Sequence, residues 1–468
     1  MMLLLKIAFR NVLRNARRSL MTMSTVAIGF MAITLFGEFM AYITIGFQTG
    51  TVERSGHLSV FRTGYFDFGA GNPAAYGISD YSSVIGLIKS DPELSQRLAV
   101  VTPTVTLFGI AGNFDIDASK TFFGLGVVPS DRDRMLQWDE YGLMGDRPPQ
   151  RSGLHDDMDT QGVVGVGLAR ILGLCQALDV ADCKTPPKPA AAKVSAADSP
   201  PAVDLAELAS RDVDPSARPK DGARIDLLAA TAGGAPNVMA LTVTKAERQG
   251  VKELDDNFVA MHLQLAQQLL YGRGEHKAVA IVLQLQRSED MALVRTRLNA
   301  LFHDKGLDLE VRDFTELQPQ YNQIIGLFGA IFSFIAIVMG MIVLFTVVNT
   351  MSMSVMERTD EIGTARAMGV RRQGIRRQFL LEGWFLGAFG ASAGLFLADV
   401  AAFGVNRCGW TWTPPGQSAA IPFRLLTSGV APMIAAVWLG LVLIATIASL
   451  VPANRAARMA VVDALRHV

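Results

Sequence analysis

The sequence predicts an α-helical membrane protein with four transmembrane helices and a large α+β domain outside the membrane. Three observations support this fold class. Of the 468 residues 50% are hydrophobic, and the mean hydropathy of +0.29 is high for a soluble protein of this size. The apolar residues concentrate in four long runs, one near the N-terminus and three in the last third of the chain. Residues 48–323 between them have the composition of an ordinary soluble domain.

Each apolar run is long enough to cross a bilayer as a helix, which takes about 20 residues. The predicted transmembrane helices cover residues 19–47, 324–351, 379–405 and 425–451. The first run contains one charged residue, Glu38. It is longer than the apolar core of a signal peptide, about 7–15 residues, and it lacks a clear cleavage site. We therefore interpret it as an uncleaved anchor.

The distribution of Lys and Arg predicts the orientation of these helices. Basic residues are concentrated in 1–18, in the 352–378 loop and in the 452–468 tail, whereas the 406–424 loop carries only two arginines. Since basic residues favour the cytoplasmic side, both termini and the 352–378 loop are expected in the cytoplasm. The domain at 48–323 and the 406–424 loop are then expected on the far side of the membrane.

The N-terminal segment 1–18 is expected to form an amphipathic helix at the cytoplasmic surface of the membrane. Its basic residues Lys6, Arg10, Arg14 and Arg17 recur at three- and four-residue steps among apolar residues. The whole chain has 43 Lys+Arg and 43 Asp+Glu, so its net charge is zero. A basic helix beside a transmembrane run in a neutral chain favours contact with membrane lipids, and no nucleic-acid partner is expected.

The soluble domain is predicted to combine a split subdomain with an inserted lobe. The local patterns are a helix at 84–98, strands at 100–113 and 121–127, a strand at 278–285, a helix at 288–306 and a strand at 309–314. Two similar halves, 48–140 and 276–320, suggest a split βαβ porter-like subdomain. Residues 141–275 between them are interpreted as an inserted second lobe.

Within that lobe, the tract 184–224 is rich in Pro, Ala and charged residues. It contains little apolar surface to bury, so we expect a mobile loop or linker. A tolerated insertion and a partner-docking segment both fit this composition. Nearby, Cys175 and Cys183 could close a small disulfide loop outside the cytoplasm, and two unpaired thiols are the alternative. Cys408 is expected to stay single.

Two ionisable residues fall within the predicted transmembrane helices. Glu38 and Asp399 are candidates for a substrate path, because charged groups inside a membrane usually face a cavity or a partner. Both lie toward the outer ends of their runs, so a position at the wet outer interface is the alternative. In the third run, the pairs Gly383/Gly387 and Gly390/Gly394 permit close helix packing, within the subunit or at a dimer interface.

The sequence lacks motifs that would indicate ATP hydrolysis or metal binding by the chain itself. It contains no G-x-x-x-x-G-K-[ST], H-E-x-x-H or C-x-x-C, and its six His are dispersed. We therefore expect no catalytic residue, no metal site and no cofactor in this chain. The isolated chain is expected not to hydrolyse ATP.

Two segments carry a family resemblance. ERTDEIGTARAMGVRRQGIRRQFLLEG at 357–383 and PANRAARMAVVDALRHV at 452–468 resemble recognisable segments of the FtsX/MacB-type ABC permeases, closest to the lipoprotein-releasing LolC/LolE permeases. The N-terminal AFRNVLRNARRSLMT and the stretch from VVGVGLARILGL onwards resemble them too. The resemblance covers nearly the whole chain except the insert at 184–224.

The resemblance implies a permease subunit of a mechanotransmission ABC transporter in the bacterial inner membrane. A cytosolic ABC ATPase dimer would bind ATP and Mg, and a second permease chain, identical or related, would complete the complex. A periplasmic acceptor or adaptor is a further implied partner. The cargo would be lipoproteins or other lipidated molecules. MacB-like tripartite efflux of small molecules or peptides, and FtsX-like signalling to a periplasmic hydrolase, are the alternatives.

The resemblance also assigns the ATPase-coupling role to the 352–378 loop. Its mixed charges suit a polar protein interface, and Ala365, Ala367 and Met368 are small or apolar enough to fit a cleft. The residues expected to couple are Glu357, Arg358, Glu361, Gly363, Arg366 and Gly369. The alternative is a solvated basic loop that reflects membrane topology alone.

Overall fold

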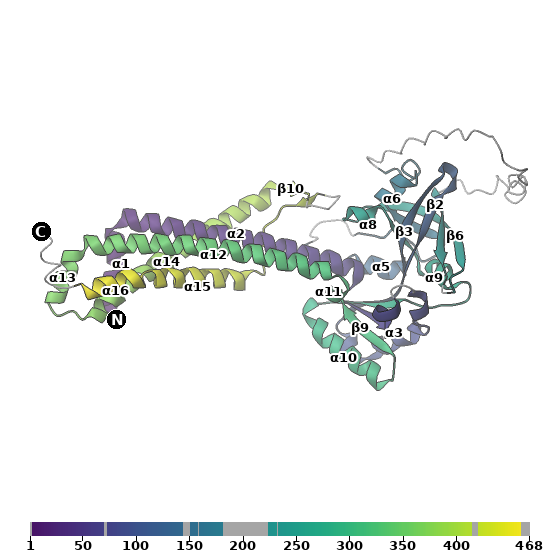
Figure 1. The fold of residues 1–468 in the computed structure, drawn as a ribbon, viewed down its shortest axis with the longest axis horizontal. Coiled ribbons are helices and arrows are strands. Elements are labelled where there is room, and N and C mark those ends of the chain that lie inside the picture. The colour runs from purple at the N-terminus through teal and green to yellow at the C-terminus, as the bar shows by residue number, and fades with distance from the viewer. Residues whose placement is uncertain are drawn as a thin grey trace, which may run out of the picture. The chain divides into compact units, whose positions relative to one another are not determined.

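The computed structural model describes residues 2–69, 73–143, 150–157, 159–180, 223–231, 233–413 and 420–459. The chain divides into two compact units, whose elements are labelled in Figure 1. The helical unit comprises Met1–Phe47, Pro319–Trp412 and Ile421–Val468. The sheet unit comprises Gln48–Gln318 and Thr413–Ala420.

The helical unit contains the predicted membrane helices. Its elements are α1 (Met2–Arg14), α2 (Ala16–Ser55), α12 (Pro319–Glu357), α13 (Thr359–Ala367), α14 (Arg372–Cys408), β10 (Thr411–Trp412), β11 (Ile421–Pro422), α15 (Ala431–Ala448) and α16 (Leu450–Arg458). In the described part of the chain, four helical stretches are long and apolar enough to cross a membrane: α2, α12, α14 and Ala431–Arg458. The prediction of four membrane-spanning helices is confirmed at this level, and it supports a membrane location.

The helix boundaries differ from the predicted ones at several points. Helix α2 continues to Ser55, past the predicted end at Phe47. The fourth apolar run was expected to be helical from Leu425, but α15 begins at Ala431. A proline in the first turn of α15 favours a helix start there, since it lacks the N–H that a preceding turn would use.

The glycines of α14 bring this helix close to its neighbours. An added Cβ on Gly394 would lie 2.5 Å from the carbonyl oxygen of Ala27 in α2. One on Gly387 would lie 2.8 Å from the Cβ of Ala445 in α15. Two faces of α14 therefore pack within the chain, as the first of the two predicted meanings requires.

The sheet unit contains nine strands in its described residues. They are β1 (Leu58–Arg62), β2 (Leu98–Asn113), β3 (Ala118–Val127), β4 (Gln161–Gly165), β5 (Ala223–Ala230), β6 (Pro236–Glu247), β7 (Phe258–His262), β8 (Ala280–Leu285) and β9 (Leu309–Asp313). Its α-helices are α3 (Tyr81–Ser90), α4 (Pro92–Ser95), α5 (Pro129–Met135), α6 (Val166–Ile171), α8 (Lys252–Asp255), α9 (Leu263–Tyr271), α10 (Met291–Asp304) and α11 (Phe314–Leu317). Short π and 3-10 segments are η1 (Tyr65–Gly69), η2 (Pro73–Tyr76), η3 (Phe114–Ile116) and η5 (Ser288–Asp290).

Six of these strands close into a barrel. The order β3-β7-β4-β6-β5-β2 returns to its start because β2 also pairs with β3. The long strand β2 makes this possible, since Val105–Asn113 pairs with β3 while Gly109–Gly112 also pairs with β5. Buried side chains of the barrel strands and of α6 and α9 form one hydrophobic core.

The first part of β2 belongs to a second, four-stranded sheet of order β2-β8-β1-β9. Each neighbouring pair in it is antiparallel. Helices α3 and α10 pack on this sheet through a separate core that includes Ile88 and Phe302. Two strand–helix–strand units, β1-α3-β2 and β8-α10-β9, are thus interleaved in the strand order of this sheet.

Two local predictions in the sheet unit need correction. The helix expected at 84–98 is interrupted, because Asp91 caps a new helix, α4, that starts with Pro92. The tract expected to be mobile over 184–224 ends inside β5, which begins at Ala223. The rest of that tract lies outside the described residues.

Candidate functional site

The candidate site surrounds helix α13, which lies between two long helices of the helical unit. One residue, Arg358, separates α13 from the end of α12. Gly369, with φ +95°, ends the helix, and the N–H of Val370 donates to the carbonyl of Ala365 at 3.1 Å. This is a glycine C-cap, and it turns the chain toward α14.

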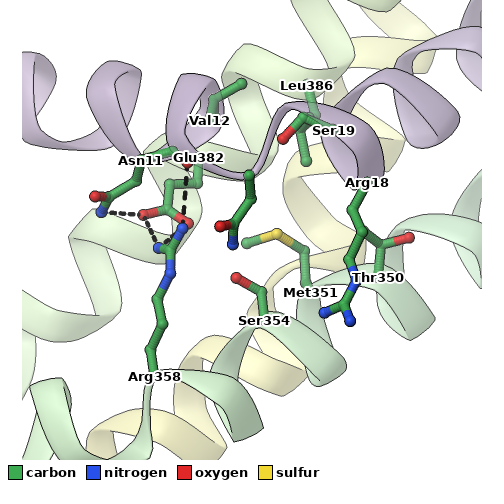
Figure 2. Close-up of a pocket in the computed structure, with 11 residues that line it drawn as sticks. Asn11, Val12, Arg18, Ser19, Thr350, Met351, Ser354, Arg358, Glu382 and Leu386 are labelled. Carbon is green, nitrogen blue, oxygen red and sulfur yellow. Dashed lines mark hydrogen bonds and ion pairs between the residues drawn. The ribbon is translucent and has the colours of Figure 1, made fainter.

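A buried ion pair joins the start of α13 to α14. The Nη1 of Arg358 lies 3.0 Å from Oε1 of Glu382, and their side chains are only 6% and 4% exposed. Asn11 of α1 donates to the same carboxylate at 2.7 Å, and its carbonyl accepts from Arg358 at 3.2 Å. Figure 2 shows the three side chains converging beside a cavity of about 20 Å³. The ion pair links α1, α13 and α14, and most of its donor and acceptor groups have hydrogen-bond partners.

Two exposed ion pairs add further links to α13 and to the end of α12. Arg14, the last residue of α1, bonds both carboxylate oxygens of Glu361 at 2.7 and 2.8 Å. That hydrogen bond raises the pKa of Arg14 above its ordinary value. Arg18 of α2 forms an ion pair with Glu357. The N-terminal helix is therefore connected to the predicted coupling loop by charge as well as by packing.

The far end of α13 contacts the end of α16. The Nη1 of Arg366 donates to the carbonyls of Ala457 and Met459 at 2.9 and 3.0 Å. Carbonyls at a helix C-terminus have no partner in their own helix, and a cation there also interacts favourably with the helix dipole. Arg366 thus ties α13 to the C-terminal helix.

These contacts show which of the predicted coupling residues are bonded within the chain and which part of the loop is exposed. Four charged side chains are bonded within the chain, Gly363 is buried, and Gly369 ends the helix. The four bonded residues are Glu357, Arg358, Glu361 and Arg366. The exposed surface is instead the turn after α13, where the Met368 side chain is 76% exposed and that of Val370 is 41% exposed.

The sequence analysis did not identify four residues as bonding partners of the 352–378 loop or of one another. They are Asn11, Arg14, Arg18 and Glu382. Three of them lie far from α13 in sequence, as the 347 residues between Arg14 and Glu361 show. Glu382 is only 24 residues from its partner Arg358. Glu382 falls inside the quoted 357–383 segment, and the other three fall in the N-terminal basic segment. The available signal was therefore the presence of basic residues in the N-terminal segment and of some acidic residues in the 357–383 segment, which does not show which residues meet.

The two ionisable residues of the membrane helices differ in environment. Glu38 is completely buried in α2, and neither of its carboxylate oxygens has a hydrogen-bond partner among the described residues. Asp399 on α14 is exposed and interacts electrostatically with Glu38. Because Glu38 is completely buried, its side chain is not in the wet environment that the alternative interpretation gave it. A role of either residue in a substrate path stays a prediction.

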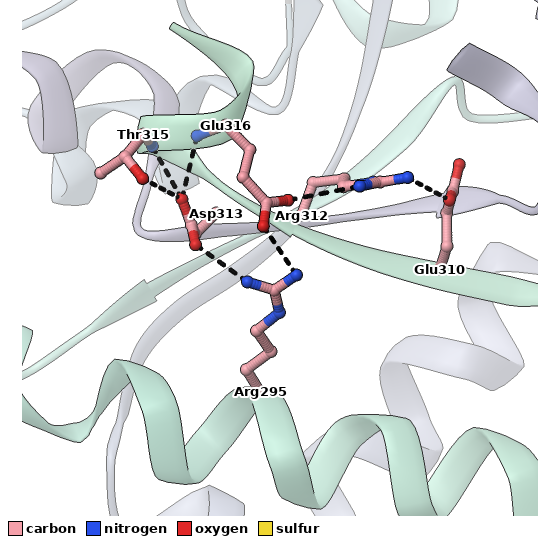
Figure 3. Close-up of polar contacts among 6 residues, drawn as sticks. All are labelled: Arg295, Glu310, Arg312, Asp313, Thr315 and Glu316. Carbon is pink, nitrogen blue, oxygen red and sulfur yellow. Dashed lines mark hydrogen bonds and ion pairs between the residues drawn. The ribbon is translucent and has the colours of Figure 1, made fainter. Parts of the chain in front are cut away.

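In the sheet unit, the chain leaves β9 through a network of charged side chains (Figure 3). Asp313 accepts from the backbone N–H groups of Thr315 and Glu316 at 2.9 and 3.0 Å, which caps α11. Arg295 of α10 pairs with Asp313 at 3.0 Å and with Glu316 at 2.8 Å. Only Gln318 then separates α11 from the start of α12. The exit toward that helix is therefore held by bonds to α10.

The other connection, the end of α2, is held in the sheet unit as well. Arg132 donates from Nη1 to the carbonyls of Glu53 and Arg54 at 3.0 and 2.8 Å. Burial lowers the pKa of Arg132 to about 10, which leaves it charged at neutral pH. The side chain of Gln284 adds a bond to the carbonyl of Val52 at 3.4 Å. Both ends that lead to membrane helices thus have dedicated polar contacts.

The described residues contain no candidate metal site, and they include only one cysteine of the predicted disulfide. Within the described ranges, no group of three or more His, Cys, Asp or Glu is placed to hold a metal ion. Cys175 is buried and disulfide-bonded, and Cys183, its predicted partner, lies outside the described residues. Cys408 is a free, exposed thiol.

Residues 330–461 match the family described as FtsX-like permease C-terminal. A macrolide export ATP-binding/permease protein MacB of Rhodopirellula baltica is 33% identical over 158 residues, which cover 34% of this chain and 21% of that protein. A lipoprotein-releasing system transmembrane protein LolC of Neisseria meningitidis is 27% identical over 177 residues, or 38% of this chain and 41% of LolC. An ABC transporter permease YtrF of Bacillus subtilis is 41% identical over 58 residues, which cover 12% of this chain. The matched segments span 13% to 41% of the length of these three relatives.

Proposed function

The chain is an FtsX/MacB-type ABC permease related to LolC, and on this premise we propose that it converts ATP hydrolysis by a separate ATPase into movement of the sheet unit. In this proposal a dimer of cytosolic ATPase subunits binds ATP and Mg. A second permease chain, identical or related, completes the transporter. The permease itself performs no chemistry and acts as a mechanical link, which is the meaning of mechanotransmission.

The observation that carries this proposal is the attachment of α13. Its start is bonded to α14 and α1 through Arg358, and its end is bonded to α16 through Arg366. A force on the exposed turn at Met368 and Val370 is therefore passed to several helices at once. The exposed methionine and valine suit a cleft on a protein partner, because apolar anchors beside arginines are typical of interface centres.

The elements that precede α13 in the sequence connect it to the sheet unit. Helix α12 runs from Glu357 back to Pro319, 39 residues of continuous helix. At its beginning the chain joins α11, which Asp313 caps and Arg295 ties to α10. A stiff helix with both ends bonded transmits displacement without unfolding, and this supports movement of the sheet unit as the output.

We place the protein in the bacterial inner membrane with both termini in the cytoplasm and the sheet unit in the periplasm. Support for this orientation comes from the arginines around α13 and α16. The cytoplasmic side is enriched in such residues near membrane helices. The arginines concerned are Arg366, Arg371, Arg372, Arg376, Arg377, Arg455 and Arg458.

The proposed cargo is a lipoprotein or another lipidated molecule that passes to a periplasmic acceptor. The LolC relative, named for lipoprotein release, supports this choice. The MacB relative, named for macrolide export, supports efflux of small molecules or peptides through an adaptor as the second candidate. Signalling to a periplasmic hydrolase, as in FtsX-like subunits, is the third.

Co-purification from native membranes separates these candidates. The tagged full chain is extracted in mild detergent, and its partners are identified by mass spectrometry. We expect an ABC ATPase in every preparation, together with a lipoprotein chaperone. An adaptor and outer-membrane channel would instead support efflux, and a cell-wall hydrolase would support signalling. Recovery of the intact chain without any ATPase would contradict the coupling proposal itself.

A variant of the exposed turn tests the coupling surface directly. Met368→Glu places a charge in the apolar contact, and we expect at least about a tenfold loss of co-purified ATPase. His303→Glu is the control, since that side chain is 91% exposed on the sheet unit. Equal ATPase recovery with both variants would exclude Met368 from the interface.

A further inference from the structure

An open pocket of about 400 Å³ lies near the C-terminal end of α14. Its walls are Asp399, Phe403, Asn406, Arg407 and, from the segment before α15, Thr427. The wall is held in place because Asn406 exchanges two hydrogen bonds with the backbone of Leu425, both at 2.9 Å. The pocket is therefore a built feature of the helical unit.

The pocket carries one charge of each sign, and the two charges do not form an ion pair. Asp399 and Arg407 are two turns apart on α14, about 12 Å along its axis. The guanidinium of Arg407 lies over the ring of Phe403, 5.2 Å from its centroid. Because Phe403 is one turn closer to Asp399 along α14, the guanidinium of Arg407 extends toward the side of the helix that carries the carboxylate.

A second observation concerns a buried carboxylate that interacts with the acidic residue of the pocket. The buried Glu38 interacts electrostatically with Asp399, and both of its oxygens are without a hydrogen-bond partner in the described part of the chain. Its backbone carbonyl accepts from the N–H of Leu426, next to the pocket wall at Thr427. Buried carboxylates normally have a compensating cation or donor. A cationic ligand group at Asp399 would supply that compensation.

The surroundings of the pocket are apolar and exposed. Phe396, Val400 and Phe403 on α14 have side chains 68%, 54% and 64% exposed. On a helix long and apolar enough to cross a membrane, such a surface faces lipid chains. A ligand with an apolar body and a charged head would contact both the pocket and this surface.

We propose that the pocket binds the zwitterionic phosphoethanolamine head group of a membrane phospholipid. Asp399 accepts hydrogen bonds from the ammonium group, and the phosphate lies against the guanidinium of Arg407. The acyl chains lie along Phe396 and Val400. This inference does not depend on ATPase coupling or on the identity of the cargo.

Native mass spectrometry of the detergent-purified full chain tests the proposal. Phosphatidylethanolamine, phosphatidylcholine and phosphatidylglycerol with identical acyl chains are added in separate titrations. We expect binding of phosphatidylethanolamine to exceed that of phosphatidylglycerol about tenfold, because only the former brings an ammonium to Asp399. Phosphatidylcholine should bind more weakly than phosphatidylethanolamine, since its quaternary nitrogen carries no N–H to donate.

Variants assign the preference to the pocket. Asp399→Asn should remove the preference over phosphatidylglycerol, and Arg407→Gln should weaken phosphatidylethanolamine binding about tenfold. Arg424→Gln is the matched control, because Arg424 is an exposed arginine of the same connecting segment that does not line the pocket. The ratio between two lipids is measured within one preparation, so it does not depend on how much of a variant is folded.

Three results would overturn the proposal. The first is equal binding of phosphatidylethanolamine and phosphatidylglycerol by the unchanged chain. The second is an unchanged lipid preference in Asp399→Asn. The third is displacement of the lipid by free phosphoethanolamine at equal concentration, which would assign the pocket to a soluble compound rather than to a membrane lipid.

Discussion

The buried pair of Arg358 and Glu382 lies where three helices meet, and its environment determines what each charge contributes. Asn11 donates to the carboxylate and accepts from the guanidinium, so both partners have additional hydrogen bonds. Removing one member of a buried pair leaves the other charge uncompensated, which costs about 3–5 kcal/mol. Replacing both by apolar residues avoids that cost.

We therefore predict that Glu382→Ala and Arg358→Met each lower the free energy of unfolding by about 3–5 kcal/mol. The double variant Arg358→Met/Glu382→Met should recover most of the loss. Reversible unfolding of the purified protein in mixed micelles measures these differences. The matched control is Arg14→Gln/Glu361→Gln, whose side chains are 52% and 58% exposed, with an expected loss below about 1 kcal/mol. Similar losses for the buried and the exposed pair would contradict this explanation.

His57 occupies a comparable position in the sheet unit, between the end of α2 and β1. Its Nδ1 accepts from the N–H of Leu285 at 3.0 Å, so its Nε2 carries the proton and donates to Ser288 at 3.1 Å. The Ser288 hydroxyl in turn donates to Glu140 at 2.7 Å. The ring packs edge-on against Trp138. These bonds require a neutral imidazole, and burial lowers the pKa of His57 from 6.5 to about 4.

The lowered pKa predicts a specific loss of stability in acid. The unfolded chain binds a proton near pH 6.5 and the folded chain only near pH 4, so the stabilising contribution is complete above about 6.5. It should be lost progressively as the pH falls from about 6.5 to about 4, by up to about 3 kcal/mol. Unfolding curves of the full chain between pH 7.5 and about pH 4 measure it.

Substitutions identify the histidine responsible. His57→Gln should reduce the pH dependence of unfolding in this window, because glutamine does not titrate. His303→Gln should leave it unchanged, since that side chain is almost fully exposed. An identical pH profile for the unchanged chain and for His57→Gln would show that another group governs the acid transition.

At the scale of elements, the close packing of α14 depends on its glycines. An added Cβ at Gly394 would approach the Ala27 carbonyl to 2.5 Å and the Cβ of Phe30 to 2.8 Å, whereas one at Gly404 would meet nothing within 4 Å. The backbone of α2 cannot give way locally as a flexible side chain could. Any side chain at Gly394 must therefore push the two helices apart.

We predict that Gly394→Val destabilises the protein by about 1–3 kcal/mol through overpacking against α2. Gly404→Ala on the same helix should be neutral or stabilising by up to about 1 kcal/mol, because alanine favours the helix more than glycine does. Thermal unfolding of the two variants in the same detergent compares them. A Gly394→Val protein as stable as the Gly404→Ala protein would mean that α2 and α14 do not pack as described.

At the scale of the whole molecule, the chain combines four helices able to cross a membrane, the short helix α13 and a sheet unit. Its sequence contains no motif for nucleotide binding. We predict that the purified chain alone shows no ATP turnover and that adding its cognate ATPase restores hydrolysis. A phosphate-release assay on protein freed of contaminating ATPases measures this. The control is the complex with Met368→Glu, in which ATPase activity should fall as the subunits separate. ATP hydrolysis by the isolated chain would overturn the assignment of the permease as a purely mechanical subunit.

The sequence by itself determined the features that depend on local composition. Four helices long and apolar enough to cross a membrane follow from apolar runs of sufficient length. The similarity to FtsX-like permeases falls on residues 330–461, which contain the 357–383 motif. Strands such as β2 and β8 were recognised because alternating or β-branched patterns are local as well. Helix ends were less accurate, since α2 runs to Ser55 and α15 starts at Ala431.

Only the tertiary structure decided which residues meet. The partners Asn11, Glu382 and Arg358 come from three distant parts of the chain, and the closure of six strands into a barrel depends on the shared strand β2. Likewise, the sequence suggested that Glu38 is a charge near a membrane edge. Packing of the helices buries it, and its carboxylate oxygens have no hydrogen-bond partner among the described residues. Such contacts arise from the summed burial of side chains across the fold, and no local window contains that information.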